Sequence, residues 1–227
     1  MKIYDILCDS SSLISLTDSD LESIIPFLQK KFPIRFLIPP SVEYEMVTRP
    51  IDSDLREFLF SAFKIKKDIN NGVITKVSLD VDEETQKLLR IANNIFFAKG
   101  KPLRIVHLGE AAMIATAKKL DVNTLLIDER TTRMLIENPF QLKSHFENEF
   151  KVNIMMQKKN LNDFIDYVRG MEIIRSSEIV ILGYENDFFE GYNDLKVDAL
   201  RAALYKIKYS GCSVSFEEIN SFIGTVK

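Results

Sequence analysis

Residues 3–14 read IYDILCDSSSLI. The run begins as a short apolar strand, reaches an acidic residue at Asp9, and continues into a pattern typical of a helix. Two further apolar runs, IRFLI at residues 34–38 and VNTLLI at residues 122–127, are separated by segments with helical spacing. Strands that alternate with helices predict an α/β domain with a largely parallel central sheet.

The composition excludes several classes of protein. A chain of 227 residues that is 46% hydrophobic can bury a real core, so it is neither a disordered segment nor a small disulfide scaffold. Cys8 and Cys212 lack any Cys-x-x-Cys spacing, and we interpret both as reduced. Since no apolar run reaches the roughly 18 residues of a membrane span, we expect a soluble, cytoplasmic protein without a membrane partner. The net charge of −3 argues against a cationic coat that binds any nucleic acid.

The chain divides into two predicted parts at Gly170: a domain over residues 1–170 and a helical appendage over residues 171–227. We expect the appendage to pack on the domain or on a second subunit, because its apolar residues are too many to leave in water. In the domain we predict a helix that is capped by Ser41 and ends at Arg49-Pro50, and an edge strand over Val152–Met156. The appendage is predicted to hold helices over residues 176–189, 195–209 and 216–226.

Four carboxylates follow strands or begin helices. Asp9 and Asp128 come directly after two of the strands, Glu45 lies early in a helix after a third, and Glu110 lies near the start of an alanine-rich helix over residues 107–120. Because parallel strands end at the same edge of a sheet, four acids from distant segments can meet in one site. Carboxylates at such short distances from one another repel unless a cation holds them together. Because the chain has only two histidines, the expected cation is one that prefers oxygen ligands, Mg²⁺ or Mn²⁺.

These four segments resemble, in order, the acidic motifs of PIN-domain nucleases, including toxin-like ribonucleases of bacteria and archaea. The motifs are Asp9-Ser10-Ser11-Ser12-Leu13-Ile14, Pro40-x-Val42-x-x-Glu45, Gly109-Glu110-Ala111-x-x-Ile114-Ala115-x-Ala117 and Leu125-Leu126-Ile127-Asp128-Glu129. The resemblance covers about residues 1–156 and implies a three-layer α/β/α fold. The sequence departs from the family pattern at Ile127, where Ser or Thr is common, in the length of the segment 52–104, and in the tail after Gly170.

The resemblance implies a metal-dependent endoribonuclease whose catalytic residues are Asp9, Glu45, Glu110 and Asp128. Asp9, Glu110 and Asp128 would hold the metal, and Glu45 would be a further ligand or would orient water. Ser11 matches a hydroxyl position that supports the first acid. RNA is the expected partner, and an antitoxin-like protein inhibitor is a candidate because many members of the family are toxins of toxin–antitoxin pairs. A homodimer is a further candidate, since the appendage could dock on a second copy.

Several other residues are open to a functional or a structural interpretation. Arg130 and Arg133 could hold the RNA backbone, or could be solvated helix residues. Glu43 and Glu129 are alternative acids next to the predicted ones, and His107 is a candidate phosphate contact. A basic rim is a further candidate, formed by Lys64, Lys66, Lys67, Lys99, Lys101 and Arg104.

Two other functions compete with the nuclease. One is a catalytically idle module that binds RNA or assembles with a partner through the same fold. The other is phosphoryl transfer through an aspartyl phosphate at Asp9, which is disfavoured because Ser11 stands where such enzymes carry a second Asp.

Overall fold

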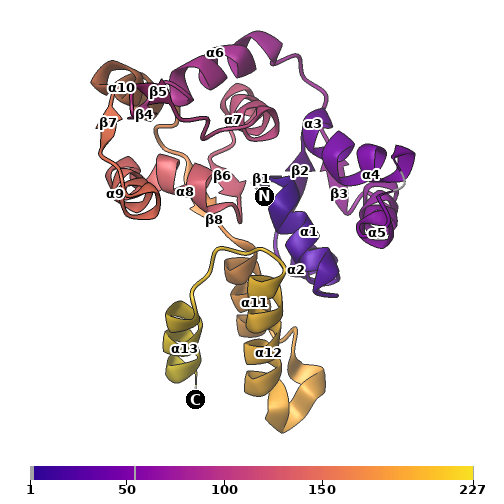
Figure 1. Cartoon of the computed structure of the whole chain (residues 1–227). Helices are drawn as coiled ribbons and strands as arrows, with labels where there is room; N and C mark the ends of the chain where they lie inside the picture. Colours follow the sequence, from indigo (N-terminus) through magenta and orange to yellow (C-terminus); the bar gives the residue numbers. More distant parts are fainter. Residues whose placement is uncertain (1–2, 54, 227) are drawn as a thin grey trace.

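The computed structural model describes residues 3–53 and 55–226, and shows an α/β protein built on a parallel sheet of five strands. The strand order is β3-β2-β1-β6-β8, and every neighbouring pair is parallel. Helices cover both faces of the sheet, as the predicted three-layer arrangement requires (Figure 1). The strands are β1 (Tyr4–Cys8), β2 (Ile34–Ile38), β3 (Ile74–Lys76), β6 (Thr124–Leu126) and β8 (Glu172–Ile174).

Alternation along the strands sends side chains into two separate cores. On β1, for example, Ile6 and Cys8 face one core whereas Leu7 faces the other. The first core is covered by α1 (Ser10–Asp18), α2 (Ile24–Lys31), α3 (Pro40–Glu43), η1 (Tyr44–Thr48), α4 (Arg49–Asp52), α5 (Leu59–Asn70), α11 (Ser176–Glu185), α12 (Lys196–Tyr209) and α13 (Phe216–Thr225). The second core is covered by α6 (Asp82–Ala92), α7 (Leu108–Leu120), α8 (Arg130–Glu137), α9 (Pro139–Phe150) and α10 (Lys158–Tyr167).

The order of the strands reverses direction at β1. The chain first moves outward from β1 to β2 and β3, then returns to place β6 and β8 on the other side of β1. In an open α/β sheet, the crevice at the carboxyl ends of the strands where such a reversal occurs is the usual place for a ligand. Here that crevice lies between the ends of β1 and β6.

The segment after Gly170 supplies part of this sheet and of its first core. Strand β8, which the sequence analysis did not anticipate, pairs with β6 as the edge strand. Helices α11, α12 and α13 then bury Ile179, Leu204 and Ile219 in the core that also covers β1 and β2. A 3-10 helix, η2 (Glu190–Leu195), joins α11 to α12.

Two local predictions are corrected. Helical structure does not end at Arg49-Pro50, because a π-helical turn over Tyr44–Thr48 widens the backbone there and α4 continues with Pro50 in its first turn. Pro39, and not Ser41, occupies the N-cap position of α3.

The strand predicted over Val152–Met156 forms, but not at the edge of the central sheet. Strand β7 (Ile154–Met156) pairs antiparallel with β4 (Phe96–Ala98), which also pairs with β5 (Lys101–Pro102). These three short strands make a separate small sheet beside the second core.

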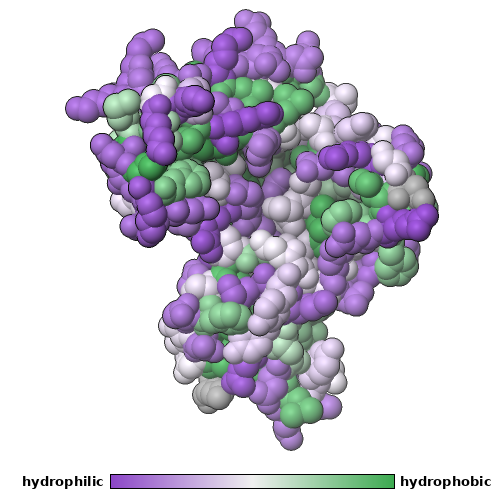
Figure 2. Space-filling model, in the orientation of Figure 1, coloured by the Kyte–Doolittle hydropathy of each residue, from purple (hydrophilic) through white to green (hydrophobic). Residues whose placement is uncertain are grey.

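The surface carries exposed aromatic side chains as well as charges. Phe60 and Phe63 on α5 are more than half exposed. Figure 2 shows apolar (green) atoms beside hydrophilic (purple) ones on the right-hand side of the molecule, where α5 lies in Figure 1. Within the described part of the chain, none of the helices combines the length and the apolar character that crossing a membrane requires.

A cluster of charges links the junction between β8 and α11 with helix α13. The guanidinium of Arg175, which is 12% exposed, donates to Glu178 at 2.7 Å and to Glu218 at 2.9 Å. Partial burial raises the pKa of Glu218, but the hydrogen bond and charge of Arg175 outweigh it, so the pKa lies below its usual 4.5. A carboxylate whose pKa is lower in the folded than in the unfolded state stabilises the protein at pH values above its unfolded-state pKa. This stabilisation is lost as the pH falls through the folded-state pKa.

We therefore predict that Glu218→Gln lowers the free energy of unfolding at neutral pH by less than about 1 kcal/mol, because the carboxylate is half exposed. Glutamine can still accept the capping-box bond that Glu218 accepts from the Ser215 N–H. The difference from wild type should disappear as urea unfolding is measured at pH values progressively below 4.5. Glu217→Gln is the matched control, and a difference that stays constant with pH would contradict the prediction.

Candidate active site

Asp9 and Asp128 lie at the same edge of the sheet, as predicted. Residues Cys8 and Leu126 are partners in the parallel ladder, and the backbone N–H of Asp9 donates to the Leu126 carbonyl at 2.9 Å. The hydroxyl of Ser12 donates to the same carbonyl, also at 2.9 Å. The two strand ends, and the acids that follow them, are therefore held side by side.

The carboxylate of Asp9 does not cap a helix. Asp9 stands at the N-cap position of α1, yet its side chain makes no capping hydrogen bond. Its oxygens accept from the hydroxyls of Ser10, at 3.3 Å, and Ser11. Burial raises the pKa of Asp9 to about 6, the Ser11 bond opposes this rise, and the charges of Glu45 and Asp128 add to it. An Asp at the start of a helix often serves only as its cap, and the side chain of Asp9 does not do this for α1.

Glu110 lies in the first turn of α7 and shares its surroundings with the other acids. Burial raises its pKa to about 7, a hydrogen bond from the His107 N–H opposes the rise, and the charges of Asp9, Glu129 and Glu45 add to it. Three acids from separate segments are therefore close enough to Glu110 to disfavour its ionised form.

Glu45 lies on the π-helical turn, and its side chain is exposed. The carboxylate stands against Gly109 at the start of α7, where a Cβ would come within 3.3 Å of Oε2. Glycine at position 109 leaves this space open to Glu45. Single π turns inside helices are frequent at functional sites, because they shift one residue out of the regular helical row.

Asp128 is fully buried and has a structural partner. Its Oδ1 accepts from the Ser176 N–H at 2.8 Å and its Oδ2 from the Ser176 hydroxyl at 2.6 Å. Ser176 begins α11, so Asp128 does not cap the helix that follows it but holds the first turn of a helix 48 residues away. Each carboxylate oxygen keeps a second lone pair that can accept another bond.

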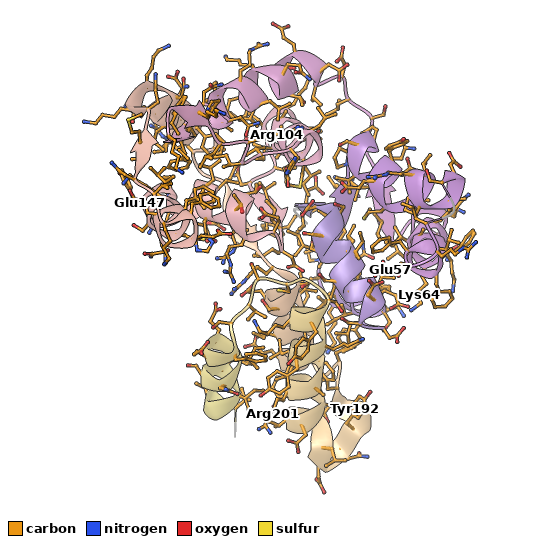
Figure 3. The ribbon with its side chains drawn as sticks, in the orientation of Figure 1. Glu57, Lys64, Arg104, Glu147, Tyr192 and Arg201 are labelled. Carbon is orange, nitrogen blue, oxygen red and sulfur yellow. The ribbon has the colours of Figure 1, made fainter. Side chains whose placement is uncertain are left out.

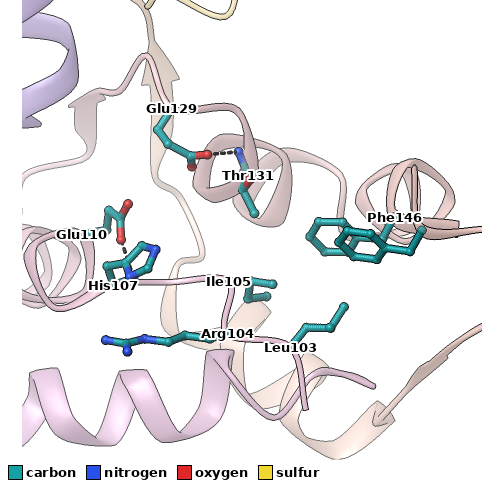
Figure 4. Close-up of a pocket in the computed structure, with 9 residues that line it drawn as sticks. Leu103, Arg104, Ile105, His107, Glu110, Glu129, Thr131 and Phe146 are labelled. Carbon is teal, nitrogen blue, oxygen red and sulfur yellow. Dashed lines mark hydrogen bonds between the residues drawn. The ribbon is translucent and has the colours of Figure 1, made fainter. Parts of the chain in front are cut away.

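Glu129, an alternative acid in the sequence, lies near Glu110. Its carboxylate caps α8 by accepting from the N–H groups of Thr131 at 2.8 Å and Thr132 at 2.6 Å. It also lines a cavity with Glu110, and the two carboxylates face the same space in Figure 4. Alternation along a strand places neighbouring side chains on opposite faces, so it gives no signal that Glu129 approaches Glu110.

The acids do not form a prearranged metal cage. Among residues 3–53 and 55–226, no group of three or more His, Cys, Asp or Glu side chains is placed so that it could hold a metal ion. The side chains of Glu110, Asp128 and Glu129 are turned toward N–H donors instead. The donor chemistry nevertheless fits a hard divalent cation, since all the ligands are carboxylate oxygens whose mutual repulsion a cation would relieve.

The predicted basic residues are dispersed. Arg130 and Arg133 line a polar cavity of about 390 Å³ between α8, α9 and the start of α13, and Arg133 also pairs with Glu137 at 2.9 Å. Lys64, labelled in Figure 3, pairs with Asp20 and Glu22, so its charge is already compensated. Arg104, also labelled there, lines the cavity beside Glu110 together with His107.

The alternative acid Glu43 is a structural residue. Its carboxylate accepts from the Thr48 hydroxyl at 3.1 Å and lies 3.5 Å from the Lys76 ammonium. Glu43 therefore pairs with β3, whereas Glu45 faces α7.

The fold and the site define the protein as a parallel α/β protein with a carboxylate cluster at the reversal point of its sheet. Comparison with models of known protein families, with curated proteins and with solved structures gave no match.

The bond between Asp128 and Ser176 generates a prediction. Ser176→Ala removes a hydroxyl from a buried carboxylate, and we expect the free energy of unfolding to fall by about 2 kcal/mol. Repeating the substitution in an Asp128→Asn background is the control, because the cost should shrink once the charge is gone. The free energy of unfolding is measured with urea. If Ser176→Ala lowers it equally in both backgrounds, the hydrogen bond to the Asp128 carboxylate is not what stabilises α11.

Proposed function

We propose that this protein is a divalent-metal-dependent endoribonuclease that hydrolyses RNA phosphodiester bonds with Asp9, Glu45, Glu110 and Asp128. The observation that carries the proposal is geometric: the Asp9 N–H and the Ser12 hydroxyl both bond to the Leu126 carbonyl, which holds the ends of β1 and β6 together beside the start of α7. The charges of neighbouring acids add to the raised pKa values of Asp9 and Glu110 at this place. Asp9 and Glu45 are the most informative, because neither side chain caps a helix. The order of the acidic motifs, which resembles that of PIN-domain nucleases, supports the same function.

In this proposal Asp9, Glu110 and Asp128 hold Mg²⁺ or Mn²⁺, with Glu45 at the exposed side. Such an ion supplies an activated water and neutralises charge on the phosphoryl oxygens. The hydroxyls of Ser10 and Ser11 fix the orientation of the Asp9 carboxylate. Glu45 lies where it can orient a water from the solvent side, and the exposed Arg130 can contact the RNA backbone.

The alternative is a catalytically idle module that binds RNA through the same fold. It is favoured by the absence of a prearranged metal cage in the described residues and by the hydrogen bonds that already engage Asp128. Metal-dependent cleavage that is sensitive to Asp9 separates the two functions.

We predict that Asp9→Asn lowers the rate of metal-dependent RNA cleavage by at least about 100-fold, since losing even a group that supports a metal ligand costs 10–100-fold. The metal-free variant should be as stable as wild type or more stable, because a carboxylate that is repelled by its neighbours has been neutralised. Cleavage of single-stranded RNA with Mg²⁺, Mn²⁺ or a chelator measures the first effect, and thermal unfolding measures the second.

Glu45→Gln and Glu43→Gln form the matched pair for the same assay. Glu45→Gln should reduce cleavage, whereas Glu43→Gln, two residues earlier on the same helical segment, should not. A wild-type protein that binds RNA but cleaves none with either metal would overturn the proposal in favour of the idle module.

Gly109→Ala should lower RNA cleavage without lowering the stability of the protein. Alanine favours the helix by up to about 1 kcal/mol, so the free energy of unfolding should stay level or rise. Its Cβ lies within 3.3 Å of Glu45 Oε2 and displaces that carboxylate by a few tenths of an ångström. We expect cleavage to fall by roughly 10-fold, since small misplacements in a site cost one to two orders of magnitude. Unchanged cleavage would indicate that the position of Glu45 is not critical.

A further inference from the structure

A cavity of about 240 Å³ adjoins the carboxylates and shares Glu110 with the proposed metal site. Glu110 and Glu129 form one side of it, and apolar side chains of α9 and of the segment before α7 form the other (Figure 4). The cavity is therefore continuous with the site yet chemically different from it. The apolar residues that line it are Leu103, Ile105, Phe146 and Phe150.

The apolar wall presents an aromatic ring to solvent. The rings of Phe146 and Phe150 stack with centroids 5.5 Å apart and planes 11° from parallel. Phe146 is buried, whereas Phe150, at the end of α9, is 45% exposed. The stack therefore ends in a ring that is only partly covered, and a planar group entering the cavity can pack against it.

Charge decides which part of a nucleotide fits here. The carboxylates of Glu110 and Glu129 both face the cavity, and away from a bound cation they would repel a phosphate placed inside it. A nucleobase is neutral, is flat, and gains from contact with an aromatic ring. Arg104 and His107 are exposed at the same cavity, where they can meet the backbone phosphate attached to that base.

We propose that this cavity binds the base of one nucleotide of single-stranded RNA, next to the phosphate presented to the carboxylates. The proposal rests on the proposed function for its substrate class, but it concerns binding and not cleavage. It makes Phe150 a specificity-determining residue for unpaired RNA, because a base that is paired and stacked in a duplex is not free to enter the cavity.

The test measures RNA binding in the Asp9→Asn protein, so that no cleavage is required. A short oligoadenylate RNA is compared with an abasic ribose-phosphate chain of the same length, by fluorescence anisotropy. Phe150→Leu should weaken oligoadenylate binding by about 10-fold and leave binding of the abasic chain unchanged, because leucine keeps the packing on Phe146 but offers no ring. Phe150→Tyr should bind like the parent.

Phe140→Leu is the matched control, since Phe140 is an exposed phenylalanine of the same helix that does not line the cavity. Equal effects of the two leucine variants, a Phe150 effect that persists on the abasic chain, or no RNA binding at all would each overturn the inference. If wild type fails to cleave RNA but the base-dependent effect of Phe150 appears, the nuclease proposal fails and the base cavity stands. If wild type cleaves RNA but Phe150→Leu does not weaken RNA binding, the base cavity fails and the nuclease proposal stands.

Discussion

The parallel pairing of β1 with β6 is the constraint on which the rest of the structure depends. It joins residues more than 110 positions apart, and it is reinforced by two bonds to one carbonyl, from the Asp9 N–H and the Ser12 hydroxyl to Leu126. Because β1 pairs with β2 on one side and with β6 on the other, the strand order reverses at β1. The same pairing that completes the sheet therefore creates the crevice and places an acid on each of its two sides.

A buried carboxyl group then ties the C-terminal segment to that crevice. Asp128 has no exposed surface, and a polar group in such a place must be hydrogen-bonded. Ser176 supplies both bonds, and the Ser213 N–H donates to the Asp128 carbonyl at 3.3 Å. Together with β8 at the sheet edge, these contacts make residues 171–227 a structural neighbour of the site. The division at Gly170 proposed from sequence thus separates segments that share one core.

Much of the fold was predictable because its central strands are apolar runs of a length that sequence patterns resolve. The end of β1 and the helix that carries Glu110 were placed from the residues alone. Strand β8 was missed because it is three residues long and only partly buried, which leaves no periodic pattern. The π turn at Glu45 was missed because residue spacing does not reveal a π turn. A proline usually ends a helix, but here the wider turn before Pro50 lets the helical path continue. The partner of Asp128 could not be found either, because Ser176 approaches it only through tertiary structure.

The five acids near the crevice differ in their structural roles, because some of the side chains stabilise a helix and others do not. This difference bears on function. Asp128 and Glu129 each stabilise the start of a helix, so their presence would be explained without any ligand. Glu110 accepts the His107 N–H at the start of its own helix, yet its pKa is still raised by burial and by neighbouring charge. Asp9 is nearly buried without capping α1, and Glu45 faces the one glycine that leaves room for it. A fold selected only for stability gains nothing from holding Asp9 and Glu45 near Glu110, since like charges in partial burial oppose folding. Asp9 and Glu45 are thus the residues at which a catalytic site and an idle scaffold differ.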